Sequence, residues 1–249
     1  IVSSDGRELH DYRQMGLVSE IFTRDILKKL PGRSAIGHVR YSTAGSSELK
    51  NAQPFAVDYA KGDMAIAHNG NLTNAFLIRS ALESSGSIFQ SNMDTEVIVH
   101  LIARSKEKTF MERVTQALQQ VEGAYSLLFL TEKEMIAARD QFGFRPLVLG
   151  KLKEAPVIAS ETCAFDLIGA QFVREIEPGE LLLVNEDGIK SFRPFPHKPR
   201  HQCIFEFIYF ARPDSFIFNR NVYEVRKSFG AQLATESTAP ADMVVPIPD

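Results

Sequence analysis

The sequence has few cysteines and no marked excess of one charge, and these shortages exclude several classes of protein. Its 249 residues include two cysteines, no tryptophan and a formal net charge of −3. Two cysteines do not make a disulfide framework, so the composition favours a cytoplasmic protein. The small net charge gives no reason to expect binding to nucleic acid or to an anionic membrane surface. No apolar run approaches the roughly 20 residues of a membrane-spanning helix.

Neither end of the sequence is typical of the end of a protein. The chain begins Ile1-Val2-Ser3-Ser4, without methionine and without the basic segment that opens a signal peptide. It ends in residues 242–249, whose pattern predicts a strand that has just begun. We therefore expect the chain to be an internal part of a longer protein.

Hydrophobic periodicity predicts three helices in the first half of the chain. The first follows Asn69-Gly70, with Asn71 or Thr73 as its cap and Gly86 after its end. Its predicted inward side chains are Leu72, Phe76, Ile78 and Leu82. The second has Asp94 at its N-cap and buries Val97, Ile98, Leu101 and Ile102. The third carries the apolar stripe Phe110, Val114, Leu118 and Val121.

The second half of the chain is richer in predicted strands. Strand-like runs cover residues 64–68, 125–130, 135–139, 146–149, 157–159 and 181–184. Helices gathered ahead of strands favour an α+β fold over repeated βαβ units. Pro194, Pro196 and Pro199 mark a stiff connection at a domain edge, and residues 222–236 predict a further helix.

Two short segments carry residues suited to an amino-acid substrate. Arg40 lies among small hydroxyl residues and glycines in residues 37–45, and a guanidinium fork matches a carboxylate. Asn69 and Gly70 follow a short apolar strand, and an amide with a neighbouring N–H can hold a developing oxyanion. Each residue also has an ordinary interpretation: Asn69-Gly70 as a hairpin turn, Arg40 as a surface ion pair, and Asp94 as a helix cap.

A nucleophile is harder to find. Cys163 has no basic neighbour in sequence, so a buried structural thiol is the better interpretation. His38 and His68 match no zinc-binding spacing, and we expect hydrogen-bonding or core histidines. The residues alone therefore predict an amino-acid site and leave its chemistry open.

Six segments resemble the glutaminase domain of the amidophosphoribosyltransferases, a family of class II glutamine amidotransferases. They are residues 37–45, 67–72, 91–96, 159–166, 174–180 and 209–215. The first two occur, with variations, across several class II glutamine amidotransferases, whereas residues 209–215 are much more specific to the purine-pathway enzymes. The resemblance extends over nearly the whole chain.

This resemblance implies an N-terminal-nucleophile hydrolase fold, a four-layer α/β/β/α sandwich with two antiparallel sheets between helices. It places a glutaminase domain at residues 1–196, a linker at 197–221, and the start of a phosphoribosyltransferase α/β domain at 222–249.

The resemblance also implies roles for particular residues. Arg40, with Thr43 nearby, would hold the glutamine α-carboxylate, and Asp94 would receive the α-ammonium group. Asn69 and Gly70 would form the oxyanion hole, and residues 41–51 would close over bound glutamine.

The implied nucleophile is a cysteine at the mature N-terminus, whose own α-amino group, with a pKa of about 7.7–8.0, serves as the base. No cysteine precedes Cys163, so we expect the nucleophile upstream of Ile1.

The implied reaction passes ammonia from glutamine to phosphoribosyl pyrophosphate and forms phosphoribosylamine, the first committed step of purine biosynthesis. The resemblance further implies Mg²⁺ bound beyond this chain, feedback by purine nucleotides and a homo-oligomer. Some members of the family hold a [4Fe–4S] cluster, for which Cys203 is the candidate ligand. The alternative is a buried thiol in an apolar strand over residues 203–208.

Two alternatives stay open. One is another class II glutamine amidotransferase, such as the glucosamine-phosphate-forming type. The other is a catalytically silent binding or regulatory domain.

Overall fold

The structure is a computed structural model that describes residues 1–39 and 48–245. The chain divides into two compact units, the first made of Ile1–Leu147 with Ile176–Gln202 and the second of Val148–Glu175 with Cys203–Asp249. These units do not follow the predicted boundaries at residues 196 and 221. The predicted division into domains therefore stays a prediction.

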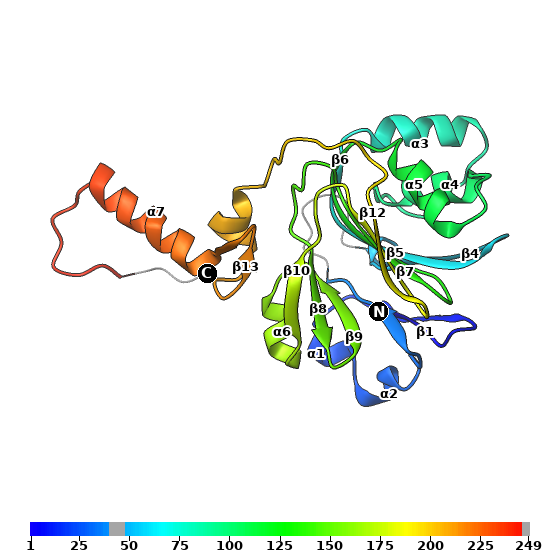
Figure 1. The fold of residues 1–249 in the computed structure, drawn as a ribbon, viewed down its shortest axis with the longest axis horizontal. Helices are drawn as coiled ribbons and strands as arrows, with labels where there is room; N and C mark the ends of the chain where they lie inside the picture. The colour runs from blue at the N-terminus through cyan, green and yellow to red at the C-terminus, as the bar shows by residue number, and fades with distance from the viewer. Residues whose placement is uncertain (40–47, 246–249) are drawn as a thin grey trace. The chain divides into compact units, whose positions relative to one another are not determined.

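A six-stranded antiparallel sheet forms the centre of the first unit (Figure 1), with the strand order β12-β11-β7-β6-β5-β4. Its strands are β4 (Phe55–Tyr59), β5 (Gly62–Leu72), β6 (Gly123–Leu130), β7 (Met135–Arg139), β11 (Leu181–Asn185) and β12 (Gly188–Phe192). β5 is the longest of them, and it pairs with β4 at its beginning and with β6 as far as Leu72.

Three helices cover one face of this sheet (Figure 1): α3 (Ala75–Ser84), α4 (Glu96–Arg104) and α5 (Phe110–Leu118). Side chains alternate along a strand, so Leu127 and Phe129 of β6 share the core with the helices. The predicted stripe on α5 is buried in the same core. A capping box between Thr109 and Glu112 fixes where this helix begins.

The other face of the sheet packs on a smaller antiparallel sheet of the order β2-β1-β3. These strands are β1 (Val2–Ser4), β2 (Leu9–Asp11) and β3 (Ser34–Ile36), and two short helices, α1 (Val18–Ile21) and α2 (Arg24–Leu27), lie between β2 and β3 in the chain. Val2 and Ile36 pack there against Ala65, Ala67 and Leu130. Helices, sheet and second sheet are thus stacked, which confirms the predicted α+β class.

The second unit contains a three-stranded sheet and a helical segment. β8 (Val148–Leu152), β9 (Ala155–Ala159) and β10 (Gln171–Glu175) pair in the order β10-β8-β9, and α6 (Cys163–Ile168) joins β9 to β10. A π-helical turn (Glu206–Phe210), β13 (Phe216–Ile217), β14 (Arg220–Asn221) and α7 (Val222–Glu236) complete it. The predicted helix at 222–236 is confirmed, and the Asn221 side chain accepts a hydrogen bond from Glu224 N–H as its cap.

Several local predictions are wrong around the first helix. The strand does not end before Asn69, because residues 69–72 continue β5 and pair with residues 123–126 of β6. α3 consequently begins at Ala75, and neither Asn71 nor Thr73 caps it. This later start turns Phe76 outward, where 78% of it is exposed, while Leu82 is buried as predicted.

Two apolar segments do not form the strands that their sequences allow. Residues 203–208, for which a strand was only the alternative interpretation, lead into the π-helical turn, and Cys203 is half-buried. Arg226 of α7 donates hydrogen bonds to the carbonyl oxygens of Phe207 (2.7 Å) and Ala211 (2.8 Å), which stabilises this turn. Residues 242–245 form no strand, and 246–249 lie outside the described residues.

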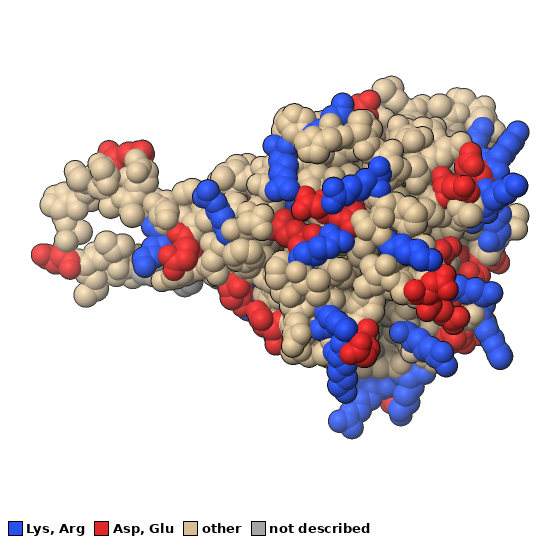
Figure 2. Space-filling model, viewed as in Figure 1, with Lys and Arg blue, Asp and Glu red and all other residues tan. Residues whose placement is uncertain are grey.

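Within the described ranges, no helix has both the length and the apolar character needed to cross a membrane. Acidic and basic side chains lie side by side on the face shown in Figure 2.

Candidate functional site

The end of β5 carries the predicted oxyanion-hole residues. Asn69 lies opposite Ser126 of β6, and Gly70 lies opposite Tyr125. Alternation along the strand places Asn69 on the same face as Ala67, the face that packs on the second sheet. Within the described part of the chain, the half-buried Asn69 side chain makes no hydrogen bond.

Gly70 is required by a close approach of two backbones. Its φ is +155°, and a Cβ built there would collide with the carbonyl oxygen of Ala124 and lie 2.7 Å from Nε2 of His68. Any side chain would therefore push β5 away from β6 beside Asn69. Glycine at this position lets the ladder continue past the predicted site.

Asp94 is brought to the same place by the loop before α4. Its Oδ2 accepts a hydrogen bond from Leu72 N–H at 2.8 Å, and its Oδ1 accepts one from Thr95 Oγ1 at 3.3 Å. The carboxylate is therefore held by the end of β5. It is not the predicted helix cap, because α4 begins at Glu96, with Thr95 at the cap position and no side-chain cap bond.

The charge of Asp94 is stabilised within the site. Burial raises the pKa of this carboxyl. The hydrogen bond and the charge of His68, together with the backbone hydrogen bonds, lower the pKa by more than burial raises it, so the net shift is downward. His68 Nδ1 lies 3.6 Å from Oδ1, and 27% of the Asp94 side chain is exposed. An ionised, partly exposed carboxylate of this kind is suited to an ammonium group.

Glu96 was not singled out from the sequence, yet it shapes the loop that carries Asp94. The buried carboxylate accepts hydrogen bonds from Gln90 N–H (2.7 Å), Ser91 N–H (2.8 Å) and Ser91 Oγ (2.6 Å). Burial raises the pKa of Glu96. Hydrogen bonds from His100, Gln90 and Ser91 lower this pKa by more than burial raises it, so the net shift is downward. An acidic residue in the first helical turn was the available signal, and it does not reveal these partners.

The predicted carboxylate-binding residues Arg40 and Thr43 lie outside the described residues. The segments on either side of them are described. His38 and Val39 before the gap, and Glu48 and Gln53 after it, line a cavity of about 170 Å³. Gln53 also accepts a hydrogen bond from the backbone N–H of His68 at 2.7 Å, which links this cavity wall to β5.

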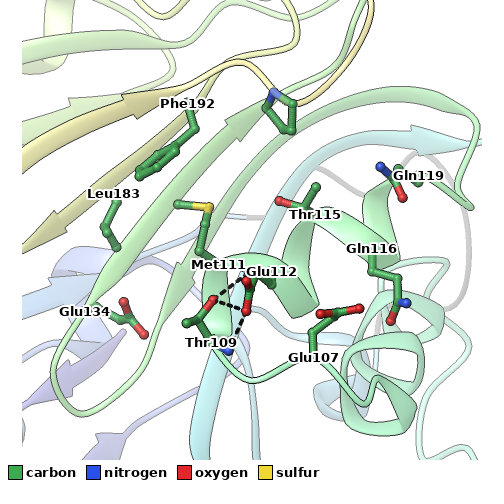
Figure 3. Close-up of a pocket in the computed structure, with 11 residues that line it drawn as sticks. Glu107, Thr109, Met111, Glu112, Thr115, Gln116, Gln119, Glu134, Leu183 and Phe192 are labelled. Carbon is green, nitrogen blue, oxygen red and sulfur yellow. Dashed lines mark hydrogen bonds between the residues drawn. The ribbon is translucent and has the colours of Figure 1, made fainter.

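A larger cavity of about 680 Å³ lies beside α5 and the strands β11 and β12 (Figure 3). Met111, Leu183, Phe192 and Pro194 give it an apolar lining, and no predicted site residue lines it. Its Glu112 is committed to the capping box with Thr109. The larger volume of this cavity is therefore no reason to place the predicted chemistry in it.

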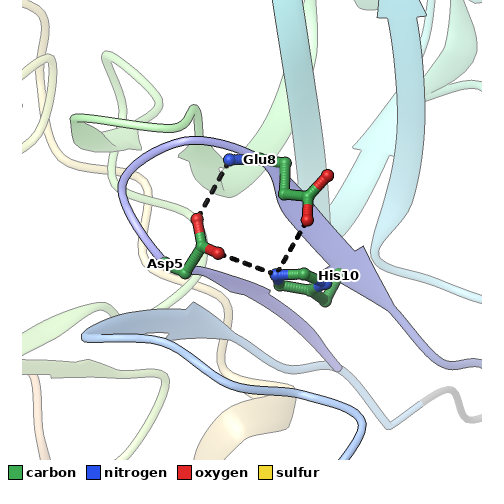
Figure 4. Close-up of side chains that lie close together, drawn as sticks. All are labelled: Asp5, Glu8 and His10. Carbon is green, nitrogen blue, oxygen red and sulfur yellow. Dashed lines mark hydrogen bonds and ion pairs between the residues drawn. The ribbon is translucent and has the colours of Figure 1, made fainter.

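Among the described residues, one group of three side chains has the spacing of a metal site: Asp5, Glu8 and His10 (Figure 4). Asp5 accepts hydrogen bonds from the N–H groups of Arg7 and Glu8, and lies 3.3 Å from Nε2 of His10. These contacts close the turn between β1 and β2. His38 and His68 are not in this group.

Both cysteines and the segments 159–166 and 209–215 belong to the second unit. Cys163 is buried as predicted, and burial raises the pKa of its thiol. Glu161 accepts hydrogen bonds from Arg212 N–H (2.8 Å) and Ser215 Oγ (2.7 Å), and Thr162 Oγ1 accepts one from Phe216 N–H (2.8 Å). The predicted segments 159–166 and 209–215 therefore form one polar cluster.

Comparison with known proteins gives the class of the chain. A family model described as a glutamine amidotransferase domain matches residues 38–166, which is more than half of the sequence. The chain therefore belongs to the glutamine amidotransferase domain family.

Within that class, the chain is similar along its whole length to amidophosphoribosyltransferases. It is 51% identical to chloroplastic amidophosphoribosyltransferase 2 of Arabidopsis thaliana, of which it covers 45%. It is 47% identical to the amidophosphoribosyltransferase of Bacillus subtilis, of which it covers 52%. The resemblance stated from the motifs is confirmed, and the chain spans about half the length of these relatives.

A solved structure has the same fold. It is glutamine phosphoribosylpyrophosphate amidotransferase from Bacillus subtilis, complexed with ADP and GMP. It matches 97% of this chain with a TM-score of 0.91 and 46% identity, and the chain covers 52% of it.

The backbone contact at Gly70 gives a first prediction. Gly70→Ala should lower the free energy of unfolding by about 1–3 kcal/mol, because the added methyl group meets the Ala124 carbonyl. Gly86→Ala is the matched control, since Gly86 has a φ of +92° and no atom within 4 Å of a built Cβ. Urea denaturation measures the free energy of unfolding of both variants. An equal decrease in the two variants would show that the backbone conformation alone, and not the contact with Ala124, causes the destabilisation.

The lowered pKa of Glu96 gives a second prediction. Its stabilising contribution is present above the unfolded pKa of about 4.3 and is lost as the pH falls through the lower folded pKa. Glu96→Gln should therefore lower the free energy of unfolding by about 1–3 kcal/mol at pH 7, and this difference should shrink below about pH 4.3. Denaturation between pH 3 and pH 8 tests this, with the exposed Glu83→Gln as control. An equal difference at pH 3 and pH 7 would contradict a role for the charge.

Proposed function

We propose that this chain is the glutamine-binding part of an amidophosphoribosyltransferase. The observation that carries the proposal is the hydrogen bond from Leu72 N–H to Asp94, three residues along β5 from Asn69 and two from Gly70. Glutamine offers an ammonium group for the carboxylate and an amide carbon whose oxygen becomes negative during attack. The end of β5 supplies a partner for each.

The proposed chemistry is acyl transfer. A thiolate attacks the side-chain amide carbon of glutamine, and the Asn69 amide and the Gly70 N–H hold the resulting oxyanion. Collapse of this intermediate breaks the C–N bond, and ammonia leaves with a proton from the catalytic base. Water then hydrolyses the remaining thioester, which releases glutamate and restores the thiol. Arg40, with Thr43, holds the α-carboxylate, and the cysteine nucleophile is proposed at the mature N-terminus of the whole protein. The released ammonia then displaces pyrophosphate from phosphoribosyl pyrophosphate.

The choice among glutamine amidotransferases rests on the second unit. Glu161 and Thr162 bind the segment that contains Arg212 and Ser215, and both segments are those that resemble the purine-pathway enzymes. A glucosamine-phosphate-forming enzyme shares the residues around Arg40 and Asn69 without the segment 209–215. A silent binding domain is the remaining alternative, and ammonia release decides it.

The same proposal includes the ligands, the assembly and the location of the whole protein. The ligands are Mg²⁺ and purine nucleotides as feedback inhibitors, the assembly is a homo-oligomer, and the location is the cytoplasm. The related Bacillus subtilis structure holds ADP and GMP, which supports the nucleotides. The Mg²⁺ ligands are proposed outside this chain.

Asn69 tests the oxyanion hole directly. In the full-length protein, Asn69→Ala should lower kcat for ammonia release from glutamine by roughly 10²–10³, because one oxyanion donor is lost. KM should change little. Asn71→Ala, two residues along the same strand and exposed, is the control. A pure rise in KM would remove Asn69 from this role, and the absence of glutaminase activity in the wild-type protein would contradict the proposed function.

Cys203 tests the proposed [4Fe–4S] cluster. Such clusters take four thiolates, and this chain has two cysteines, so its residues make no complete site and Cys203 supplies one ligand at most. In a cluster-containing protein, the full-length chain purified without oxygen should contain iron and sulfide, and Cys203→Ser should lose them. Cys163→Ser is the matched control. An iron-free and active wild-type protein would contradict the cluster.

A further inference from the structure

A buried histidine lies directly behind the proposed glutamine site. His68 is only 4% exposed, and alternation along β5 places it on the helix-facing side with Ile66 and Leu72. Burying a polar ring costs free energy unless its nitrogens are hydrogen-bonded. The partners of His68 therefore indicate what it does.

His68 is held on several sides by named partners. Nδ1 lies 3.0 Å from Thr95 Oγ1 and 3.6 Å from Asp94 Oδ1, and Nε2 lies 3.4 Å from the Ala124 carbonyl oxygen. Its backbone N–H donates to Gln53 Oε1 at 2.7 Å. The ring is thus fixed between β6 and the loop before α4, with Nδ1 directed at the proposed ammonium-binding carboxylate.

Thr95 connects this ring to Asp94. The residue is fully buried, and its hydroxyl lies within hydrogen-bond distance of His68 Nδ1 (3.0 Å) and of Asp94 Oδ1 (3.3 Å). A hydroxyl donates one proton and accepts at two lone pairs. It can therefore join the ring and the carboxylate into one hydrogen-bonded series.

The series completes the support of Asp94. Leu72 N–H fixes Oδ2 of the carboxylate, and Thr95 with His68 fixes Oδ1. Both oxygens are thus restrained from the protein side, while 27% of the side chain stays exposed. A carboxylate that cannot rotate offers its remaining lone pairs in one direction, which favours a donor placed there.

We propose that His68 and Thr95 are positioning residues that orient Asp94 and so make the site selective for a substrate with an α-ammonium group. This inference rests on the proposed function. The competing interpretation is that both residues only fill the layer between sheet and helices. That role would affect all substrates alike, whereas positioning of Asp94 affects the recognition of the ammonium group.

The test compares glutamine with 4-carbamoylbutanoate, its analogue without the α-amino group, in the full-length protein. The measured quantity is the ratio of kcat/KM for the two substrates. Asp94→Asn should remove most of the preference for glutamine. Thr95→Val, which keeps the shape and removes the hydroxyl, should lower the ratio about 10-fold, because one hydrogen bond to a charged group is lost. Thr95→Ser, which restores the hydroxyl, should bring the ratio back.

Variants of His68 give an independent comparison. His68→Asn keeps a polar group near the position of Nδ1, and His68→Gln keeps one near Nε2. The ratio should stay closer to the wild-type value in His68→Asn, because the Nδ1 side faces Thr95 and Asp94. This pair decides the question if Thr95→Val does not fold, which denaturation midpoints show.

The outcomes separate the two proposals. A wild-type protein that hydrolyses glutamine, with an unchanged ratio in folded Thr95→Val and equal ratios in the two His68 variants, would overturn the positioning role alone. An equal loss of kcat/KM on both substrates would also overturn it, in favour of a packing role. A wild-type protein that releases no ammonia from glutamine would overturn the proposed function itself.

Discussion

The hydrogen bond from Leu72 N–H to the Asp94 carboxylate joins the two segments on which the candidate site depends. Leu72 is the last residue of β5, and Asp94 lies two residues before α4. This bond fixes Oδ2 of the carboxylate directly to the backbone of the strand that carries Asn69 and Gly70. With it, a carboxylate more than twenty positions away in the chain is held at the end of the strand that carries Asn69 and Gly70.

The register of β5 against β6 then decides which side chains face the proposed glutamine site. His68 lies on the helix-facing side and Asn69 on the side of the second sheet, and a slip of one residue would exchange the two. Gly70 tolerates the approach of the Ala124 carbonyl, and Gly123 likewise lies against the backbone of residues 71–73. Glycine at these two positions lets the strands stay paired where a side chain would separate them.

Periodicity predicted the long helices better than it predicted the ends of the elements around the candidate site, and the roles of the site residues stay predictions. Asn69, Gly70 and Asp94 were predicted from residue chemistry and resemblance, and periodicity alone located α5 and α7. The capping role of Asp94 was wrong, because a tertiary partner, Leu72 N–H, competes for the same carboxylate. The short edge strands β4 and β12 were missed. β12 is exposed along its whole length, so no buried apolar face marks it in the sequence. The partners of Glu96 are mostly backbone N–H groups of a nearby loop, which residue types do not reveal.

Two segments that resemble known families lie in different compact units of the chain. Segment 67–72, which several class II glutamine amidotransferases share, forms the end of β5 in the first unit. Segment 209–215, which is more specific to the amidophosphoribosyltransferases, meets segment 159–166 in the second unit, where Glu161 binds Arg212 N–H and Ser215 Oγ across about fifty positions of sequence. A carboxylate that satisfies donors in a distant loop constrains both segments at once, because a change in either leaves a polar group unpaired. Separate sets of contacts therefore hold segments 67–72 and 209–215 in place.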